Sequence, residues 1–314
     1  MGVDQAAGAP ALGARPRLGY AMAAAAASLW GLNGTVSKVL LASGYSALRL
    51  AQVRSAGAFV GLLAIAALTA PERLRPQRRE LLPLSLFGVL GLAFVQWFYF
   101  LAIHRLAIGV ALLIQYLAPL LLALWARLVM RERVRARVWL ALLLALAGLA
   151  LVLDVRERSS LPEAGVVFAL LAAFSYAFYL LLAERALPRR DALTLLVWGF
   201  GFASLFWAGL VPWWSFPGRL VSERVSLLGR LAHTQLPVSL LLAALILLGT
   251  IAPFFLLVSA LKHLPATRVG IVAMLEPVVA TVVAWAWLGE SLGGSQLLGG
   301  CVVLAAILLA QTAR

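Results

Sequence analysis

Charged residues are scarce in this chain. They make up 12% of its 314 residues, whereas hydrophobic residues make up 63%; ordinary soluble domains have about 25% charged and about 45–50% apolar residues. A water-soluble globule cannot bury that much apolar surface, and disordered chains are poor in apolar residues. The apolar runs are continuous, whereas the strands of outer-membrane barrels alternate apolar and polar residues. The composition therefore indicates a polytopic helical membrane protein.

Cysteine and histidine are also scarce. The single cysteine, Cys301, cannot form a disulfide within the chain, and one cysteine with three scattered histidines cannot assemble a Cys/His zinc site or an iron–sulfur site. The sequence has no Gly-x-x-x-x-Gly-Lys-Ser/Thr motif, which excludes direct use of ATP. We therefore expect no cofactor, no metal and no redox chemistry.

Ten apolar runs of roughly 20 residues are bounded by charges or by proline and glycine clusters. We expect each run to form a membrane-spanning helix, so the predicted fold class is an all-α polytopic membrane protein. Residues 1–17 have no apolar core of their own and are expected to form a tail ahead of an uncleaved first span. The predicted spans are residues 18–42, 47–70, 80–103, 106–130, 136–154, 162–183, 193–213, 237–262, 266–288 and 294–312.

Basic residues gather at the ends of these spans. The net charge is +14, but the clustering in short loops is typical of topology control and not of nucleic-acid binding. The densest clusters, at 73–79, 127–137 and 185–190, fall on one side of the bilayer if the amino terminus is inside. We therefore expect a multi-pass protein of the plasma (inner) membrane, in contact with lipid and with both termini in the cytoplasm.

The two halves of the chain match each other. Residues 102–151 align with 260–309 without a gap, and a second register relates the first span to the sixth. The informative pairs are Pro119 with Pro277, Glu132 with Glu290 and, in the second register, Trp30 with Tyr176. The chain is therefore predicted to contain two five-helix repeats, residues 18–154 and 162–312. Because five is odd, the second repeat would enter the membrane inverted relative to the first.

Two segments carry a resemblance to a known family. Residues 28–38 read SLWGLNGTVSK, and residues 275–290 read LEPVVATVVAWAWLGE. With ten spans and the repeated proline-to-glutamate spacing, they resemble the EamA-type members of the drug/metabolite transporter superfamily. One departure is Met130-Arg131-Glu132, where the family usually has Leu-Gly-Glu.

The resemblance implies a carrier driven by protons or another gradient. Such carriers most often export amino acids or similar metabolites through a central cavity between the halves, with the fifth and tenth spans as scaffold. The fifth span supports the scaffold role independently, because residues 138–153 contain no polar side chain.

Glu276 is predicted near the middle of the ninth span. An ionisable group at that depth is expensive and normally marks a transport pathway or a proton relay, so we predict a proton-coupling role. The alternative is a glutamate that is hydrogen-bonded to a neighbouring helix and locks the two halves together. The repeat partner of Pro277 is Pro119, which is preceded by Ala118 and not by an acid. Coupling through this position would therefore be asymmetric.

Arg54 is the one basic residue predicted to lie inside a span. It could bind a substrate carboxylate or Glu276 in a bidentate manner, or its guanidinium could reach outward to the membrane surface.

Other polar and aromatic side chains are expected at membrane depth. Each one alone could serve as a hydrogen bond between helices, worth about 0.6 kcal/mol; their clustering in the first, third, fourth and sixth spans favours a binding site. Together with Arg54, the predicted substrate-binding residues are Trp30, Asn33, Gln96, Tyr99, Gln115, Tyr116, Tyr176 and Tyr179.

Glycine and proline positions predict how the helices pack and bend. The Gly57–Gly61 pair predicts a close helix contact, either within the chain or in a homodimer. Pro119, Pro253 and Pro277 are predicted hinges, with static kinks as the alternative.

We therefore predict a secondary active transporter that exports amino acids or similar small metabolites by alternating access, coupled to protons. The alternatives are an intramembrane enzyme acting on lipid-linked substrates, and a passive channel or lipid scramblase. The sequence offers no catalytic groups for such an enzyme: the aspartates Asp4, Asp154 and Asp191 fall outside the spans or at the end of one, so no Asp-rich diphosphate site can form within the membrane. We expect no catalytic residues and no metal ligands.

Overall fold

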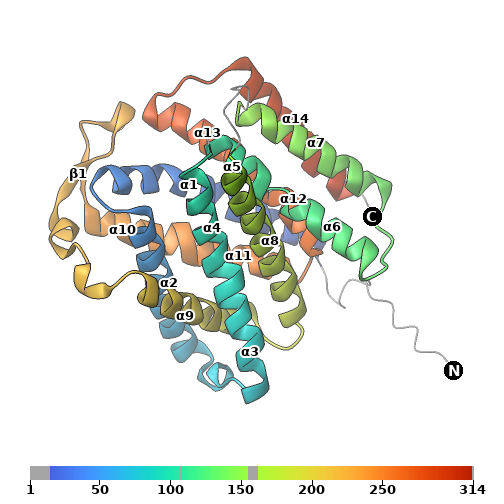
Figure 1. Cartoon of the computed structure of the whole chain (residues 1–314), viewed down its shortest axis with the longest axis horizontal. Coiled ribbons are helices and arrows are strands. Elements are labelled where there is room, and N and C mark those ends of the chain that lie inside the picture. Colours follow the sequence, from blue (N-terminus) through green and yellow to red (C-terminus); the bar gives the residue numbers. More distant parts are fainter. Residues whose placement is uncertain (1–14, 107, 155–161, 313–314) are drawn as a thin grey trace.

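The computed structural model describes residues 15–106, 108–154 and 162–312, which are almost entirely helical (Figure 1). Most of the predicted tail, residues 1–14, lies outside the described part. The helices are α1 (Pro16–Ala42), α2 (Ala47–Thr69), α3 (Arg78–Leu86), α4 (Phe94–Ile103), α5 (Ile108–Gln115), α6 (Ala118–Leu128), α7 (Ala136–Val152), α8 (Glu163–Ala186), α9 (Ala192–Leu210), α10 (Val238–Ile246), α11 (Ala252–Ala260), α12 (Ala266–Ala273), α13 (Leu275–Val283) and α14 (Gly294–Thr312).

Shorter elements join these helices. Three are π-helical: η2 (Phe87–Ala93) between α3 and α4, η6 (Leu247–Ile251) between α10 and α11, and η7 (Ala284–Leu288) after α13. The long loop after α9 holds a two-stranded antiparallel sheet of β1 (Arg224–Ser226) and β2 (Gln235–Pro237). The remaining turns are the 3₁₀ helices η1 (Pro71–Leu74), η3 (Trp213–Ser215), η4 (Gly218–Ser222) and η5 (Gly229–Leu231).

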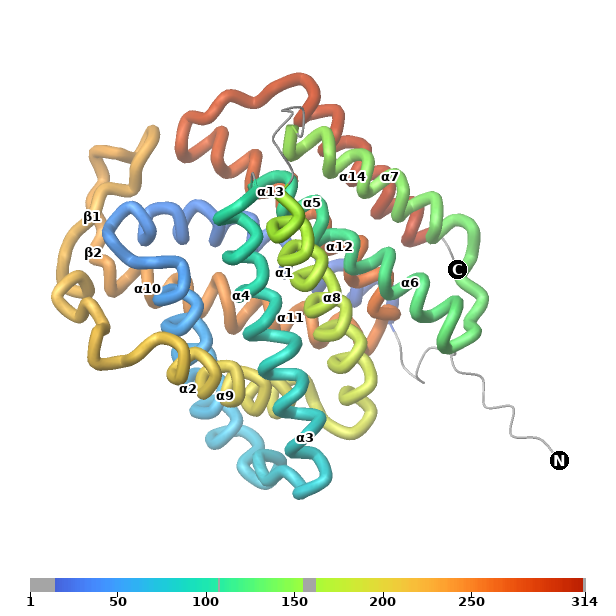
Figure 2. The backbone as a smooth tube through the Cα atoms, viewed as in Figure 1, coloured from blue at the N-terminus to red at the C-terminus, as the bar shows by residue number. Residues whose placement is uncertain are grey.

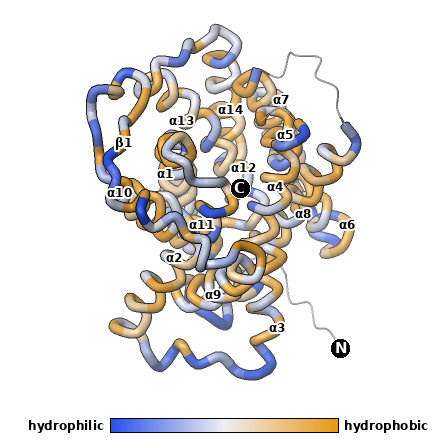
Figure 3. The backbone as a smooth tube through the Cα atoms, turned by 60° about the vertical axis from the view of Figure 1, so that its left-hand side comes forward, coloured by the Kyte–Doolittle hydropathy of each residue, from blue (hydrophilic) through white to orange (hydrophobic). Residues whose placement is uncertain are grey.

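Eight helical stretches are long and apolar enough to cross a membrane. They are Ala47–Thr69, Arg78–Ile103, Ile108–Leu128, Glu163–Ala186, Ala192–Leu210, Val238–Ala260, Ala266–Leu288 and Gly294–Thr312. Each coincides with a predicted span. The apolar helix α7 is shorter, and α1 is not among the eight, so the total of ten spans stays a prediction. Figure 3 shows the hydrophilic residues gathered mostly in the connecting loops.

Helix starts follow from local sequence. The Ser46 hydroxyl accepts a hydrogen bond from the Arg49 N–H at the start of α2, and Asp191 caps α9 in the same way through Thr194. Such caps satisfy N–H groups that have no partner inside the helix. Proline stands directly before α8, α10 and α12, where it cannot disrupt an existing helical bond.

The predicted bends coincide with helix interruptions. Pro119 is the second residue of α6, Pro253 is the second residue of α11, which directly follows η6, and Pro277 lies in the first turn of α13. In the first turn of a helix the missing N–H leaves no intrahelical bond unmade. The three long stretches are therefore broken one turn or less before each proline.

The first helix of each repeat packs mainly on helices of the other repeat. α1 packs against α10–α13, and we call these helices the α1 unit; α8 packs against α4, α5, α6 and η2, and with α3 they form the α8 unit. In Figures 1 and 2, α4 and α8 cross in front of α1 and α11. α2 lies along α9, and α7 lies along α14. The packing units therefore combine helices of both predicted repeats.

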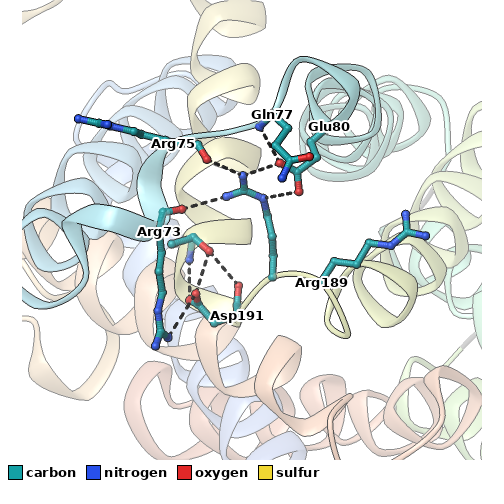
Figure 4. A pocket seen from close by; sticks show the side chains of 8 residues that line it. Arg73, Arg75, Gln77, Glu80, Arg189 and Asp191 are labelled. Atoms are coloured by element: carbon teal, nitrogen blue, oxygen red, sulfur yellow. Dashed lines mark hydrogen bonds and ion pairs between the residues drawn. The ribbon is translucent and has the colours of Figure 1, made fainter.

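Arg190 and Arg49 form hydrogen bonds at the two ends of the α2–α9 pair. Arg190 donates to both carboxylate oxygens of Glu80 and to the carbonyls of Arg73 and Arg75, as Figure 4 shows. At the opposite end of α2, the Arg49 guanidinium donates to the carbonyls of Pro212 and Ser215. Both loops are thereby tied to the helix pair.

The helix-capping residue Asp191 directly follows Arg190 and lies near Arg73. Burial alone would raise the pKa of Asp191, but hydrogen bonds from the Thr194 N–H and hydroxyl outweigh burial, and the pKa lies below its usual value. Asp191 therefore caps α9 as a carboxylate.

Glycines allow the closest helix contacts. Gly57 and Gly61 of α2 lie against Ile246 and Ile251, so this predicted contact occurs within the chain. On α7, a Cβ at Gly148 would lie 2.8 Å from the Gly299 carbonyl oxygen of α14, closer than real Cβ atoms approach backbone.

We expect Gly148→Val to lower the stability of the folded protein by about 1–3 kcal/mol, as overpacking typically does. The added side chain must push α7 away from α14. Thermal unfolding in detergent measures the effect, and Gly209→Ala, which meets no atom within 4 Å, is the control. Equal midpoints for the two variants would show that the α7–α14 contact is not tight.

Candidate functional site

Glu276 lies near the middle of its membrane-crossing stretch, at the second residue of α13. Its carboxylate accepts a 2.7 Å hydrogen bond from the hydroxyl of Tyr116. Tyr116 stands in the interruption between α5 and α6 and is 2% exposed. Two helix breaks, one from each predicted repeat, therefore meet at one partly buried acid–hydroxyl pair.

Aromatic side chains continue from this pair toward α1. The Tyr116 ring lies 6.3 Å from the Tyr176 ring in an edge-on arrangement, and Tyr176 stacks on Tyr179 at 6.1 Å. Tyr179 contacts Phe254, which contacts Trp30 edge-on at 5.0 Å. These geometries are the ones that aromatic pairs prefer. The structure thus brings four predicted site residues, Trp30 and three tyrosines, into one chain of ring contacts.

Arg54 bonds to the π-helical segment η6. Its Nε donates to the Thr250 hydroxyl at 3.1 Å, and its Nη2 donates to the Gly249 carbonyl at 2.9 Å. The Thr250 hydroxyl in turn donates to the Leu245 carbonyl at 2.9 Å. A π-helical turn disturbs the regular bonding of a helix, and these bonds occupy carbonyls at that turn. Of the two predicted orientations for Arg54, the structure has the one directed into the protein.

Arg54 and Glu276 interact electrostatically without a direct ion pair among the described residues. The Glu276 carboxylate interacts electrostatically with Arg54, Tyr99 and Tyr176, although within the described part of the chain no ion pair joins it directly to Arg54. A guanidinium has five N–H donors. The two bonds to η6 use two of these donors, and no hydrogen bond within the described part of the chain uses the other three.

Several buried oxygens have no hydrogen-bond partner. Asn33 is 8% exposed and packs against Gly249, where any Cβ would overlap its amide. Gln96 donates to the Leu92 carbonyl of its own helix. The buried polar oxygens without a partner at these predicted site residues are Asn33 Oδ1, Gln96 Oε1, Gln115 Oε1, Tyr176 OH and Tyr179 OH. Contacts join Asn33 and the tyrosines to the region described above, whereas the described contacts do not join Gln96 or Gln115 to it.

Two glycines of the site were not identified from the sequence. Gly91 in η2 packs against Tyr179, just as Gly249 in η6 packs against Asn33. The registers that pair Pro119 with Pro277 and Trp30 with Tyr176 also pair these two glycines and these two side chains. Repeated glycines at matching positions were the available signal. Thr250 gave no such signal, because a threonine in an apolar helix is common.

The chemistry that these groups offer is limited to protons and hydrogen bonds. Within the described ranges, no three histidine, cysteine, aspartate or glutamate side chains lie together as metal ligands would. A carboxylate, a guanidinium, amides and phenols can exchange a proton with water and can bind a small polar molecule.

Comparison with known proteins gives the relationship of the whole chain. The model of the EamA-like transporter family matches residues 17–154 and again residues 163–312. The threonine/homoserine exporter RhtA of Salmonella typhimurium is 30% identical over 273 residues, covering 84% of this chain and 80% of that protein. An uncharacterised transporter of Archaeoglobus fulgidus is 29% identical over 89% of this chain and 92% of its own length.

Two further comparisons agree. The uncharacterised inner membrane transporter YicL of Salmonella typhimurium is 25% identical over 90% of this chain and 92% of its own length. One solved crystal structure superimposes with a TM-score of 0.73 at 19% identity, covering 93% of this chain and 96% of the other, which shows the shared fold. With two copies of the family repeat spanning nearly all of it, this chain belongs to the EamA-like transporter family and is a multi-pass membrane transporter, not an enzyme.

Proposed function

We propose that this transporter is a secondary active exporter of small amino acids, coupled to protons through Glu276. The observation that carries the proposal is the partly buried Glu276–Tyr116 pair at the middle of the membrane-crossing stretches. An acid at that depth needs a partner and is normally functional. Tyr116 supplies the hydrogen bond, and Arg54 supplies an opposite charge nearby.

The substrate class follows from the polarity of the site. An α-amino acid carries an ammonium group, which donates hydrogen bonds, and a carboxylate, which accepts them. The carboxylate of Glu276 and the unpartnered oxygens of Asn33, Tyr176 and Tyr179 suit the ammonium group and any side-chain hydroxyl. The remaining donors of Arg54 suit the carboxylate. Similarity to RhtA, a threonine/homoserine exporter, supports amino acids that carry a hydroxyl.

We infer that transport proceeds by alternating access in a protein built from two inverted repeats, residues 18–154 and 162–312, with both termini in the cytoplasm. The breaks before Pro119, Pro253 and Pro277 would serve as hinges, since a helix bends most easily where its hydrogen bonds are already interrupted. A passive channel is the competing function. Channels show no acceleration of efflux by substrate on the far side, so counterflow distinguishes the two.

We expect Glu276→Gln to abolish uphill amino-acid transport driven by a pH gradient in proteoliposomes, because the amide cannot take up and release the proton. Glu290→Gln is the matched control: Glu290 is 51% exposed and pairs with Lys38 at 2.6 Å, and exposed ion pairs contribute little. Full gradient-driven transport by Glu276→Gln would contradict the coupling role.

We expect threonine and homoserine to drive counterflow of each other at least about tenfold better than leucine or glutamate. Leucine leaves the buried oxygens unpaired, which costs about 1–3 kcal/mol for each such group, and glutamate adds a second negative charge near Glu276. A substrate-competition series in proteoliposomes measures the ranking. Equal competition by leucine would exclude the proposed hydroxyl recognition.

We expect Arg54→Gln to raise the apparent KM for amino-acid transport about tenfold or more, because a hydrogen bond to a charged group contributes about 1.5–3 kcal/mol. Arg54→Lys, which keeps the charge, should lie between the wild type and Arg54→Gln. The amount of folded protein in the membrane is the control, since Arg54 also supports η6. An unchanged constant at normal abundance would restrict Arg54 to that structural role.

A further inference from the structure

We propose that Tyr116 is the residue that transmits protonation of Glu276 to helix movement, by holding the α1 unit and the α8 unit together more strongly while Glu276 is ionised. The proposal rests on the proton coupling proposed above and adds the mechanical link. Tyr116 acts here as a positioning residue, because it acts through Glu276.

The hydrogen bond between the two side chains crosses from one packing unit to the other. Glu276 belongs to α13 in the α1 unit, and Tyr116 lies between α5 and α6 in the α8 unit. Helix α12 contacts α6 close by: a Cβ at Gly270 would lie 2.8 Å from the Pro119 ring. The Tyr116–Glu276 bond is therefore placed beside a close contact between the two units.

At the start of α12 the Ala266 N–H donates to the Glu184 carboxylate of α8 at 3.0 Å, but the contacts between the units next to the Tyr116–Glu276 pair are apolar. Tyr179 meets Phe254 through ring edges at 5.9 Å, and Gly270 meets Pro119 through carbon atoms. Such contacts do not change with protonation. The Tyr116–Glu276 bond does change, because a hydrogen bond to a carboxylate is roughly twice as strong as one between neutral groups. Protonation of Glu276 therefore weakens one specific link and leaves the remaining contacts as they were.

Few other groups can substitute for Tyr116 in this role. The titratable and charged groups that interact with Glu276 in the described part of the chain are Arg54 from α2, Tyr99 from α4, Tyr116, and Tyr176 from α8. On the α1 side, the helix presents Gly31 against the Glu276 backbone, and its Lys38 pairs instead with Glu290. Tyr99 and Tyr176 make no hydrogen bond to Glu276 among the described contacts, so Tyr116 alone joins the units through the acid.

The first test measures transport of threonine in proteoliposomes by wild type, Tyr116→Phe and Tyr176→Phe. Tyr116→Phe removes one hydroxyl and keeps the ring that contacts Tyr176. We expect its ratio of gradient-driven accumulation to counterflow at equal pH to fall at least about tenfold below the wild-type ratio, and its pH profile to flatten. Tyr176→Phe makes the same chemical change at a hydroxyl without a partner, and we expect it to keep the wild-type ratio of gradient-driven accumulation to counterflow.

The outcomes distinguish failure of the Tyr116 link from failure of the proton coupling itself. Equal loss of counterflow and gradient-driven accumulation in Tyr116→Phe would reduce Tyr116 to a structural or binding residue, and normal pH dependence would overturn the inference outright. If the wild type shows counterflow without any response to a pH gradient, the proton-coupling function fails first.

A second measurement does not depend on the substrate. Hydrogen–deuterium exchange in nanodiscs at one fixed pH compares wild type, Glu276→Gln, Tyr116→Phe and the double variant. We expect both single variants to raise deuterium uptake in α6 and α12 by a similar factor, and the double variant to add nothing, because both changes remove the same link. Uptake raised by Glu276→Gln but unchanged by Tyr116→Phe would overturn the inference.

Discussion

A carboxyl group at the middle of a membrane protein must have partners, and the central arrangement of this protein follows from that requirement. The carboxylate of Glu276 accepts a hydrogen bond from the Tyr116 hydroxyl at 2.7 Å and interacts electrostatically with the Arg54 guanidinium. Providing these partners requires side chains from α2, α5–α6 and α13 to converge. The helix breaks and the close α12–α6 contact bring the backbones near enough for that convergence.

The backbone faces the same requirement. In hydrocarbon each carbonyl needs a donor, and a π-helical turn such as η6 alters the regular pattern of donors. Thr250 donates to the Leu245 carbonyl and Arg54 donates to the Gly249 carbonyl. Side chains therefore provide some of the donors for backbone carbonyls at this turn. The same arginine therefore supports a bent helix and contributes the positive charge near Glu276, which joins the shape of α10–α11 to the electrostatics of the site.

Much of the architecture could be predicted from sequence, because hydropathy and proline positions act locally. Eight of the predicted spans coincide with long apolar helices, and helices break near Pro119, Pro253 and Pro277. The exchange of first helices between repeats could not be predicted, since uniform leucine and alanine faces do not reveal partners. For the same reason the contact of Asn33 with Gly249 and the choice of Thr250 as a partner for Arg54 required the structure. Gln96 and Gln115 were predicted as site residues because they are polar at membrane depth. Polarity alone does not predict which residues a side chain contacts, and the described contacts do not join these two to the site.

The exchanged packing also bears on how the protein is made. Synthesis begins at the amino terminus, so α1 enters the membrane long before α11, α12 and α13 exist. Its packing face is built from small residues, among them Ala23, Ala26 and Ala27, which are fully buried in the finished protein. Until the last third of the chain arrives, that face has only lipid or provisional neighbours to contact. Assembly of the α1 unit is therefore a late, long-range event, and a chain that stops after its first repeat lacks the partners of its own first helix.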